Sequence, residues 1–145
     1  MSADAPPPEE RKRVVLVDDH PVLRESVCHY LAGEGLEVVG QAGSVAEAVP
    51  LVDGLNPDLV ITDLSLPDAS GTDLIRALNA NRHDRVPKLV LSMHDESVYA
   101  LRALRAGAHG YLMKGAASEV LVDVVWTLLR GGFYVSPEQA SRMQS

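Results

Sequence analysis

The chain has 145 residues and a formal net charge of −7, enough for one domain of ordinary size. Hydrophobic residues make up 46% and charged residues 23% of the sequence, a balance that excludes wholesale disorder. The acidic charge disfavours direct binding of nucleic acid, and no apolar run approaches the roughly 18 residues of a membrane span.

The N-terminal residues and the cysteine content bear on organisation and compartment. Residues 1–12 are polar, contain three consecutive prolines and lack the apolar stretch of a secretory signal, so we predict a disordered tail. Cys28 is the single thiol and cannot form an internal disulfide, which fits the reducing cytoplasm. We therefore predict a cytoplasmic protein whose main domain covers residues 13–131.

Short apolar runs along this domain indicate strands. There are five, at residues 14–17, 36–42, 59–62, 88–93 and 110–113. Four of them are continuous rather than alternating, which is typical of strands buried on both faces of a parallel sheet. Helical patterns lie between the runs, so strand and helix alternate along the chain. This order predicts an α/β fold with helices on both faces of a parallel sheet.

Local signals mark helix starts and one irregularity. Ser44 with Glu47, and Ser70 with Asp73, have the spacing of capping boxes at the starts of the second and third helices. Pro50 falls inside the second helix, and we expect it to kink or shorten that helix because proline cannot donate a backbone hydrogen bond.

Polar side chains follow four of the predicted strands. Asp18 and Asp19 follow the first strand, Asp63 the third and Lys114 the fifth, and the fourth strand ends near Ser92. Because the carboxyl ends of parallel strands share one edge of the sheet, these side chains should meet there. Carboxylates suit Mg²⁺, and a lysine and a hydroxyl suit phosphoryl oxygens. The set predicts a phosphoryl-transfer site in which an aspartate acts as nucleophile.

Four segments follow one another in the order VVLVDDHPVLRE, DLVITDLSLPDASG, VLSMHD and AGAHGYLMKG. In this combination the chain resembles the receiver domain of bacterial two-component response regulators, from about Arg13 to Gly132. The resemblance implies a flavodoxin-like (βα)5 fold, a doubly wound parallel sheet with strand order 2-1-3-4-5. The segments DDHP, LSMH, GAHGYLMK and LLRGGFYVSP further resemble the subfamily with a C-terminal helix-turn-helix DNA-binding domain.

The resemblance implies a role for each residue at the strand ends. Asp63 matches the aspartate that accepts the phosphoryl group, and Lys114 the lysine that pairs with it. Ser92 matches the switch hydroxyl, which moves to the phosphoryl group. Tyr111 matches the switch aromatic, which turns inward when that hydroxyl moves.

The resemblance also implies a Mg²⁺ site. Its ligands would be Asp18, Asp19, Asp63 and the backbone carbonyl of Ser65. Ala117 departs from the family pattern, because it stands where a capping serine is common, so we expect a less firmly fixed start of the last helix.

The implied partners are a sensor histidine kinase, a second copy of the chain and DNA. Dimerisation would use a face of the fourth or fifth helix, and DNA would bind only through a C-terminal domain not in this chain. Residues 132–145 would begin the linker to that domain, although FYVSPEQASRMQS also fits a short strand and the start of a helix. On this interpretation the protein is not an enzyme beyond its own phosphorylation and dephosphorylation, and it has no membrane partner.

Two other functions share parts of this pattern. A phosphohydrolase with an aspartate nucleophile usually needs a second aspartate two residues after the first, where this chain has Ser65. A flavin- or nucleotide-binding module would need a phosphate-binding loop after the first strand. That loop is DDHPVLRE here, which is acidic and lacks glycine.

Overall fold

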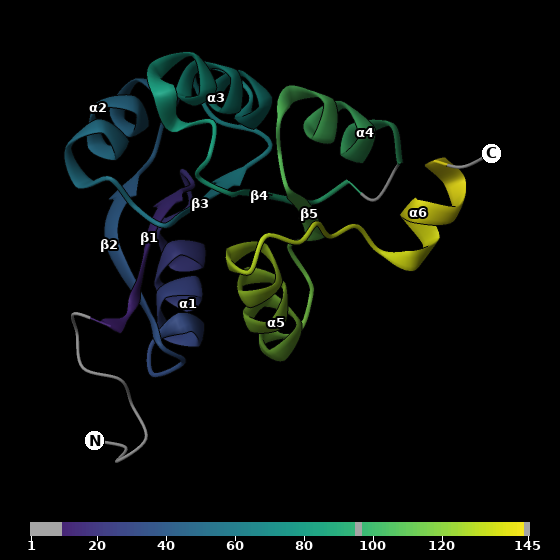
Figure 1. The fold of residues 1–145 in the computed structure, drawn as a ribbon, viewed down its shortest axis with the longest axis horizontal. Coiled ribbons are helices and arrows are strands. Elements are labelled where there is room, and N and C mark those ends of the chain that lie inside the picture. Colours follow the sequence, from purple (N-terminus) through teal and green to yellow (C-terminus); the bar gives the residue numbers. More distant parts are fainter. Residues whose placement is uncertain (1–9, 95–96, 144–145) are drawn as a thin grey trace.

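A parallel sheet with strand order β2-β1-β3-β4-β5 runs through the middle of the molecule (Figure 1). The structure, a computed structural model, describes residues 10–94 and 97–143. The strands are β1 (Lys12–Val17), β2 (Leu36–Ala42), β3 (Leu59–Asp63), β4 (Lys88–Ser92) and β5 (Gly110–Met113). The predicted α/β fold and its strand order are confirmed.

Helices cover both faces of the sheet, with α1 and α5 on one side and α2, α3 and α4 on the other (Figure 1). Their bounds are α1 (Pro21–Leu31), α2 (Val45–Leu55), α3 (Gly71–Leu78), η2 (Asn79–His83), α4 (Ser97–Ala106), α5 (Ser118–Leu129) and α6 (Pro137–Met143). Within the described part of the chain, no helix is long and apolar enough to cross a membrane.

The core is aliphatic on both sides of the sheet. β3 and β4 are buried at every position, which explains their continuous apolar runs. Between the sheet, α1 and α5, buried leucines and valines form one cluster. On the other side, two smaller clusters lie under α2 and α3 and under α4. Apolar packing on both faces therefore holds the sheet in place and fixes the positions of the residues at its carboxyl edge.

The helix starts agree with the capping signals in detail. The Ser44 hydroxyl accepts the backbone N–H of Glu47 at 3.2 Å. Ser70 and Asp73 form the full reciprocal box at the start of α3. By contrast, α5 begins after Ala117 with no side-chain cap, as expected.

Three segments add to or depart from the sequence interpretation. α2 continues through Pro50 to Leu55, so the expected shortening does not occur. β1 begins at Lys12, within the range predicted as a tail. The remainder of that tail, residues 1–9, lies outside the described residues.

Candidate functional site

The predicted site residues meet at the carboxyl edge of the sheet. Asp18 and Asp19 directly follow β1, and Lys114 directly follows β5. Asp63 is the last residue of β3, and Ser92 is the last residue of β4. The order β1-β3-β4-β5 makes these strands neighbours, so four consecutive strand ends bring five polar groups to the same place, two of them from β1.

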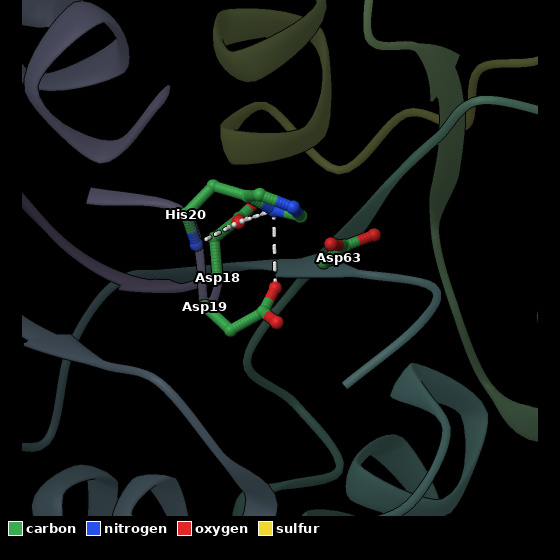
Figure 2. A group of neighbouring side chains, drawn as sticks. All are labelled: Asp18, Asp19, His20 and Asp63. Atoms are coloured by element: carbon green, nitrogen blue, oxygen red, sulfur yellow. Dashed lines mark hydrogen bonds and ion pairs between the residues drawn. The ribbon is translucent and has the colours of Figure 1, made fainter. Parts of the chain in front are cut away.

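Three carboxylates and one imidazole face a common space (Figure 2). Each of Asp18, Asp19, His20 and Asp63 offers one ligand atom, and these atoms lie within 4.8 Å of one another. Asp18 and Asp63 are buried, with exposed fractions of 1% and 4%, whereas the side chain of Asp19 is 36% exposed. The cluster thus has a buried floor and a side open to solvent.

His20 is a member of this cluster that the strand-end argument missed. Its backbone N–H donates to Asp18 Oδ1 at 2.8 Å, and its Nδ1 lies 3.0 Å from the same oxygen. Nδ1 is also 3.1 Å from Asp19 Oδ1. The imidazole therefore bridges the acidic pair. Its position directly after Asp18-Asp19 was the available signal, but at the sequence level that position is equally typical of a residue before a helix start.

Lys114 joins the two buried carboxylates. Its Nζ donates a hydrogen bond to Asp63 Oδ2 at 2.7 Å and lies 3.4 Å from Asp18 Oδ2. Burial by itself lowers the pKa of Lys114, but the hydrogen bond and charge of Asp63, together with the charge of Asp18, outweigh burial and raise it. The ammonium group therefore stays charged, and it lies where it could also pair with an anionic group attached to Asp63.

The loop after β3 holds the Asp63 carboxylate from the other side. The Ser65 backbone N–H donates to Asp63 Oδ1 at 3.2 Å, while Lys114 bonds Oδ2. The Gly71 N–H donates to the Leu64 carbonyl at 2.8 Å. A Cβ atom at Gly71 would lie 2.3 Å from the Asp63 carbonyl oxygen, so the close approach of this loop needs glycine.

Ser92 and Tyr111 are linked through His94. The buried Ser92 hydroxyl accepts the His94 N–H at 2.9 Å, and the Tyr111 hydroxyl donates to the His94 carbonyl at 2.5 Å. Tyr111 is fully buried, so the switch aromatic is already in its inward position. In this position the His94 carbonyl accepts the Tyr111 hydroxyl and the ring packs in the cluster under α4, while Ser92 still accepts the His94 N–H, so the predicted movement of Tyr111 in response to Ser92 stays a prediction.

An open pocket of about 290 Å³ lies over Asp63. It is lined by Asp19, His20, Asp63, Ser65, Leu66, Pro67, Ser92, Met93, His94 and Lys114. A phosphoryl group is small enough for this space, and the pocket presents a carboxylate, a hydroxyl and an ammonium group to it.

The donor set also fits a hard divalent cation. Asp18 Oδ2 is buried and its only near partner among the described residues is Lys114 Nζ, at an ion-pair distance of 3.4 Å that is too loose for a hydrogen bond, so it keeps acceptor capacity for a cation. Mg²⁺ prefers a few carboxylate oxygens and several waters, which the half-open side at Asp19 allows. The Asp18, Asp19 and Asp63 cluster can hold such an ion.

A 2-1-3-4-5 parallel sheet with an aspartate cluster and a lysine at its carboxyl edge is the arrangement that the sequence resemblance to receiver domains implies. Residues 14–126 match the family model of the response regulator receiver domain. The chain therefore belongs to this family, which sets it apart from the phosphohydrolases and nucleotide-binding modules considered above.

Curated relatives point the same way. The chain is 37% identical over 131 residues to the transcriptional regulatory protein DegU of Brevibacillus brevis, covering 90% of this chain and 55% of that protein. It is 35% identical over 133 residues to the transcriptional regulatory protein UhpA of Escherichia coli, covering 91% and 66%. The chain thus spans between about half and two-thirds of the length of these relatives.

Solved structures agree in fold. A LuxR-family two-component response regulator from Aurantimonas sp. SI85-9A1 superposes with a TM-score of 0.86 at 33% identity, covering 92% of this chain and 96% of that one. The signal receiver domain of the response regulator NarL from Mycobacterium tuberculosis gives a TM-score of 0.78 at 33% identity, with coverage of 84% and 98%. The resemblance to receiver domains of transcriptional response regulators is confirmed.

Proposed function

We propose that this receiver domain accepts a phosphoryl group on Asp63 from a phosphohistidine of a sensor histidine kinase. One oxygen of the Asp63 carboxylate attacks the phosphorus, and the bond from phosphorus to the imidazole nitrogen breaks. The electron pair of that bond stays on the nitrogen, which takes up a proton from water so that a neutral histidine leaves. The observation that carries the proposal is the 2.7 Å contact between Lys114 Nζ and Asp63 Oδ2 in an open acidic pocket.

The chain's own residues would hold the transferred group in place. Lys114 would keep one hydrogen bond at the carboxylate or shift to a phosphoryl oxygen, where its charge offsets the roughly two negative charges that arrive. The Ser92 hydroxyl would turn from the His94 N–H toward the phosphoryl group. The Ser65 N–H would stay on the carboxylate side and orient Asp63.

Asp18, Asp19, Asp63 and the Ser65 carbonyl would hold Mg²⁺. When bound, the ion neutralises carboxylate and phosphoryl charge and so lowers the repulsion between nucleophile and donor. Ser65 and His94 border the pocket and would control the access of water that later removes the phosphoryl group. The protein would thus catalyse only its own phosphorylation and dephosphorylation.

The regulatory effect of phosphorylation would follow from a shift between two conformational states of the domain. Phosphorylation favours the state in which Ser92 faces the phosphoryl group and Tyr111 stays inward, because only that state makes the new hydrogen bonds. By analogy with the transcriptional regulators among its relatives, this shift would control dimerisation through α4 or α5, or DNA binding through a domain outside this chain.

Intact mass spectrometry with acetyl phosphate and Mg²⁺ tests this function. We expect the wild type to gain one phosphoryl group and Asp63→Asn to gain none. Asp123→Asn is the matched control, because this exposed α5 carboxylate is remote from the pocket and should leave the gain intact. Equal labelling of Asp63→Asn and the wild type would contradict the proposal.

A further inference from the structure

His20 is the member of the cluster in Figure 2 that the proposed phosphoryl chemistry does not use. Its Nδ1 lies 3.0 Å from Asp18 Oδ1 and 3.1 Å from Asp19 Oδ1, so it is within reach of both carboxylates of the acidic pair. Its ligand atom and that of Asp63 also lie within 4.8 Å of each other. A nitrogen donor therefore faces the space that the three carboxylates share.

The backbone around His20 fixes where the imidazole lies. Pro21, the first residue of α1, restricts the residue before it to an extended conformation, and His20 has a φ of −100° and a ψ of 105°. The His20 N–H donates to Asp18 Oδ1 at 2.8 Å, and the His20 carbonyl accepts the N–H of Arg24 at 3.0 Å. The His20 side chain makes no capping hydrogen bond to α1. The backbone thus places the ring beside the carboxylates, and the ring has no part in starting the helix.

The distances from His20 Nδ1 match those between neighbouring ligands of one small cation. Nitrogen and oxygen ligands lie about 2.0–2.2 Å from ions such as Mg²⁺ and Zn²⁺, so two ligands at a right angle are about 3 Å apart. The separations of 3.0 Å and 3.1 Å are of this size. A hydrogen bond explains only part of the arrangement, because the Nδ1 atom carries at most one proton and two carboxylate oxygens lie at nearly the same distance from it.

The charges in the cluster also favour a divalent cation. When the three carboxylates are ionised, the ammonium group of Lys114 balances one of the three negative charges. Asp18 is 1% exposed, and among the described residues its Oδ2 has only the 3.4 Å ion pair with Lys114 and no hydrogen bond. A buried carboxylate oxygen with spare acceptor capacity points to a cation independently of His20.

An imidazole among carboxylates changes which cation a site prefers. Mg²⁺ binds oxygen ligands and gives up its waters reluctantly, so a nitrogen ligand adds little to its affinity. Imidazole suits Fe²⁺, Ni²⁺ and Zn²⁺, and the affinity of a mixed nitrogen and oxygen site rises from Mn²⁺ through Co²⁺ to Ni²⁺. The His20 side chain is 64% exposed, so it can adjust to an ion without repacking the core. The donor set therefore fits a borderline transition metal as well as Mg²⁺.

We propose that His20 is a nitrogen ligand of the cation site, and that it raises the affinity of this site for borderline divalent transition metals, such as Co²⁺, relative to Mg²⁺. The inference rests on the proposed cation site at Asp18, Asp19 and Asp63. The alternative is a protonated imidazole that only bridges Asp18 and Asp19. Such an imidazolium competes with a cation, so removing the ring would tighten metal binding, whereas removing a ligand weakens it.

Isothermal titration of Co²⁺ and of Mg²⁺ into the full chain compares the wild type with His20→Ala. We expect the Co²⁺ affinity of His20→Ala to fall about tenfold, because one ligand is lost, and its Mg²⁺ affinity to change by less than about twofold. His29→Ala is the matched control, since it removes an exposed imidazole from the other end of α1 and should match the wild type for both ions. An unchanged ratio of the two affinities in His20→Ala, or tighter binding of both ions, would overturn the inference.

Pulsed electron paramagnetic resonance of bound Mn²⁺ tests the ligation directly, because the spin echo is modulated by the nitrogen of a coordinated imidazole. We expect this modulation in the wild type and in His29→Ala, and we expect it to be absent from His20→Ala. Modulation that persists in His20→Ala, or its absence from the wild type, would contradict ligation by His20 and leave the proposed Mg²⁺ site intact. A wild type that binds neither Mg²⁺ nor Co²⁺ would instead overturn the proposed cation site, and the role of His20 with it.

Discussion

Two lysines at opposite ends of the sheet show how partners decide the state of the same residue type. Lys114 follows β5 at the carboxyl edge, where Asp63 and Asp18 raise its pKa in spite of burial. Lys88 begins β4 at the other edge and is fully buried. Its Nζ donates to Asn79 Oδ1 at 2.6 Å and to the His83 carbonyl, both of them neutral acceptors.

Burial lowers the pKa of Lys88 to about 8, and the charge of Asp84 offsets only part of this effect. The comparison shows that Lys114 supplies a positive charge to two carboxylates, whereas Lys88 supplies hydrogen bonds to neutral acceptors. Its partner Asn79 also donates to the Ala106 carbonyl, so Lys88 helps to tie the end of α3 to the end of α4.

The largest expected effect comes from removing the charged lysine. Lys114→Met leaves the buried carboxylates of Asp18 and Asp63 without a cation between them and removes the partner of the incoming phosphoryl group. We expect the rate of phosphorylation by acetyl phosphate to fall by about 100-fold, as for other preorganised electrostatic groups. The rate is followed by intact mass against time.

Lys88→Met is the matched control for that variant. It removes a buried lysine from the opposite edge of the sheet and should leave the phosphorylation rate unchanged. Equal losses in Lys114→Met and Lys88→Met would contradict the division of roles, because they would show that both lysines act only through the stability of the fold.

The next largest effect is a pH dependence of stability. The folded-state pKa of Lys88, about 8, is below the ordinary lysine value of 10.5, so between these values the unfolded chain binds more protons and stability rises with pH. We expect the free energy of unfolding of the wild type, relative to Lys88→Met, to increase by about 2 kcal/mol from pH 7.5 to 9.5.

Urea unfolding of both proteins at the two pH values measures this difference. Parallel behaviour of wild type and Lys88→Met would show that the buried ammonium is fully stabilised by its neutral partners. The contribution of Lys114 to stability depends on pH in the opposite direction. Because its pKa is raised in the folded state, that contribution is present below the unfolded-state pKa and is lost as the pH rises through the folded-state value.

The smallest effect concerns the helix that follows Lys114. α5 starts after Ala117 without a side-chain cap, whereas α3 has a complete capping box at Ser70. Ala117→Ser should raise the free energy of unfolding by about 1 kcal/mol, and Ser70→Ala should lower it by a similar amount. Urea unfolding measures both, and a destabilising Ala117→Ser would show that the loop after Lys114 depends on the uncapped start.

The carboxyl edge could be predicted from sequence because its residues follow directly from chain order. Asp63 and Ser92 end their strands and Asp18 and Lys114 directly follow theirs, and a parallel sheet brings such ends together. The Lys88 network could not be predicted in this way. It depends on the irregular turn of η2, where Arg82 has a φ of 70°. It also depends on the contact between Lys88 Nζ and Asn79 Oδ1, which no hydrophobic periodicity in the sequence indicates.

The same distinction holds around the switch. The sequence indicates Tyr111 through a family resemblance, but its hydrogen bond to the His94 carbonyl depends on the conformation of the loop after β4. Likewise the residues after Gly132 have too little apolar periodicity to predict a structure. Their bridge to Gly110 and their packing on α4 arise from tertiary contacts, which override weak local propensity.

The central claim is that Asp63 itself carries the phosphoryl group, and locating the modification tests it most directly. Wild-type protein is treated with acetyl phosphate and Mg²⁺, reduced with sodium borohydride and analysed by peptide mass spectrometry. Reduction converts an aspartyl phosphate to homoserine, so the account predicts homoserine at position 63 and unmodified aspartates at positions 18 and 19. Homoserine at position 18 or 19, with Asp63 intact, would contradict it.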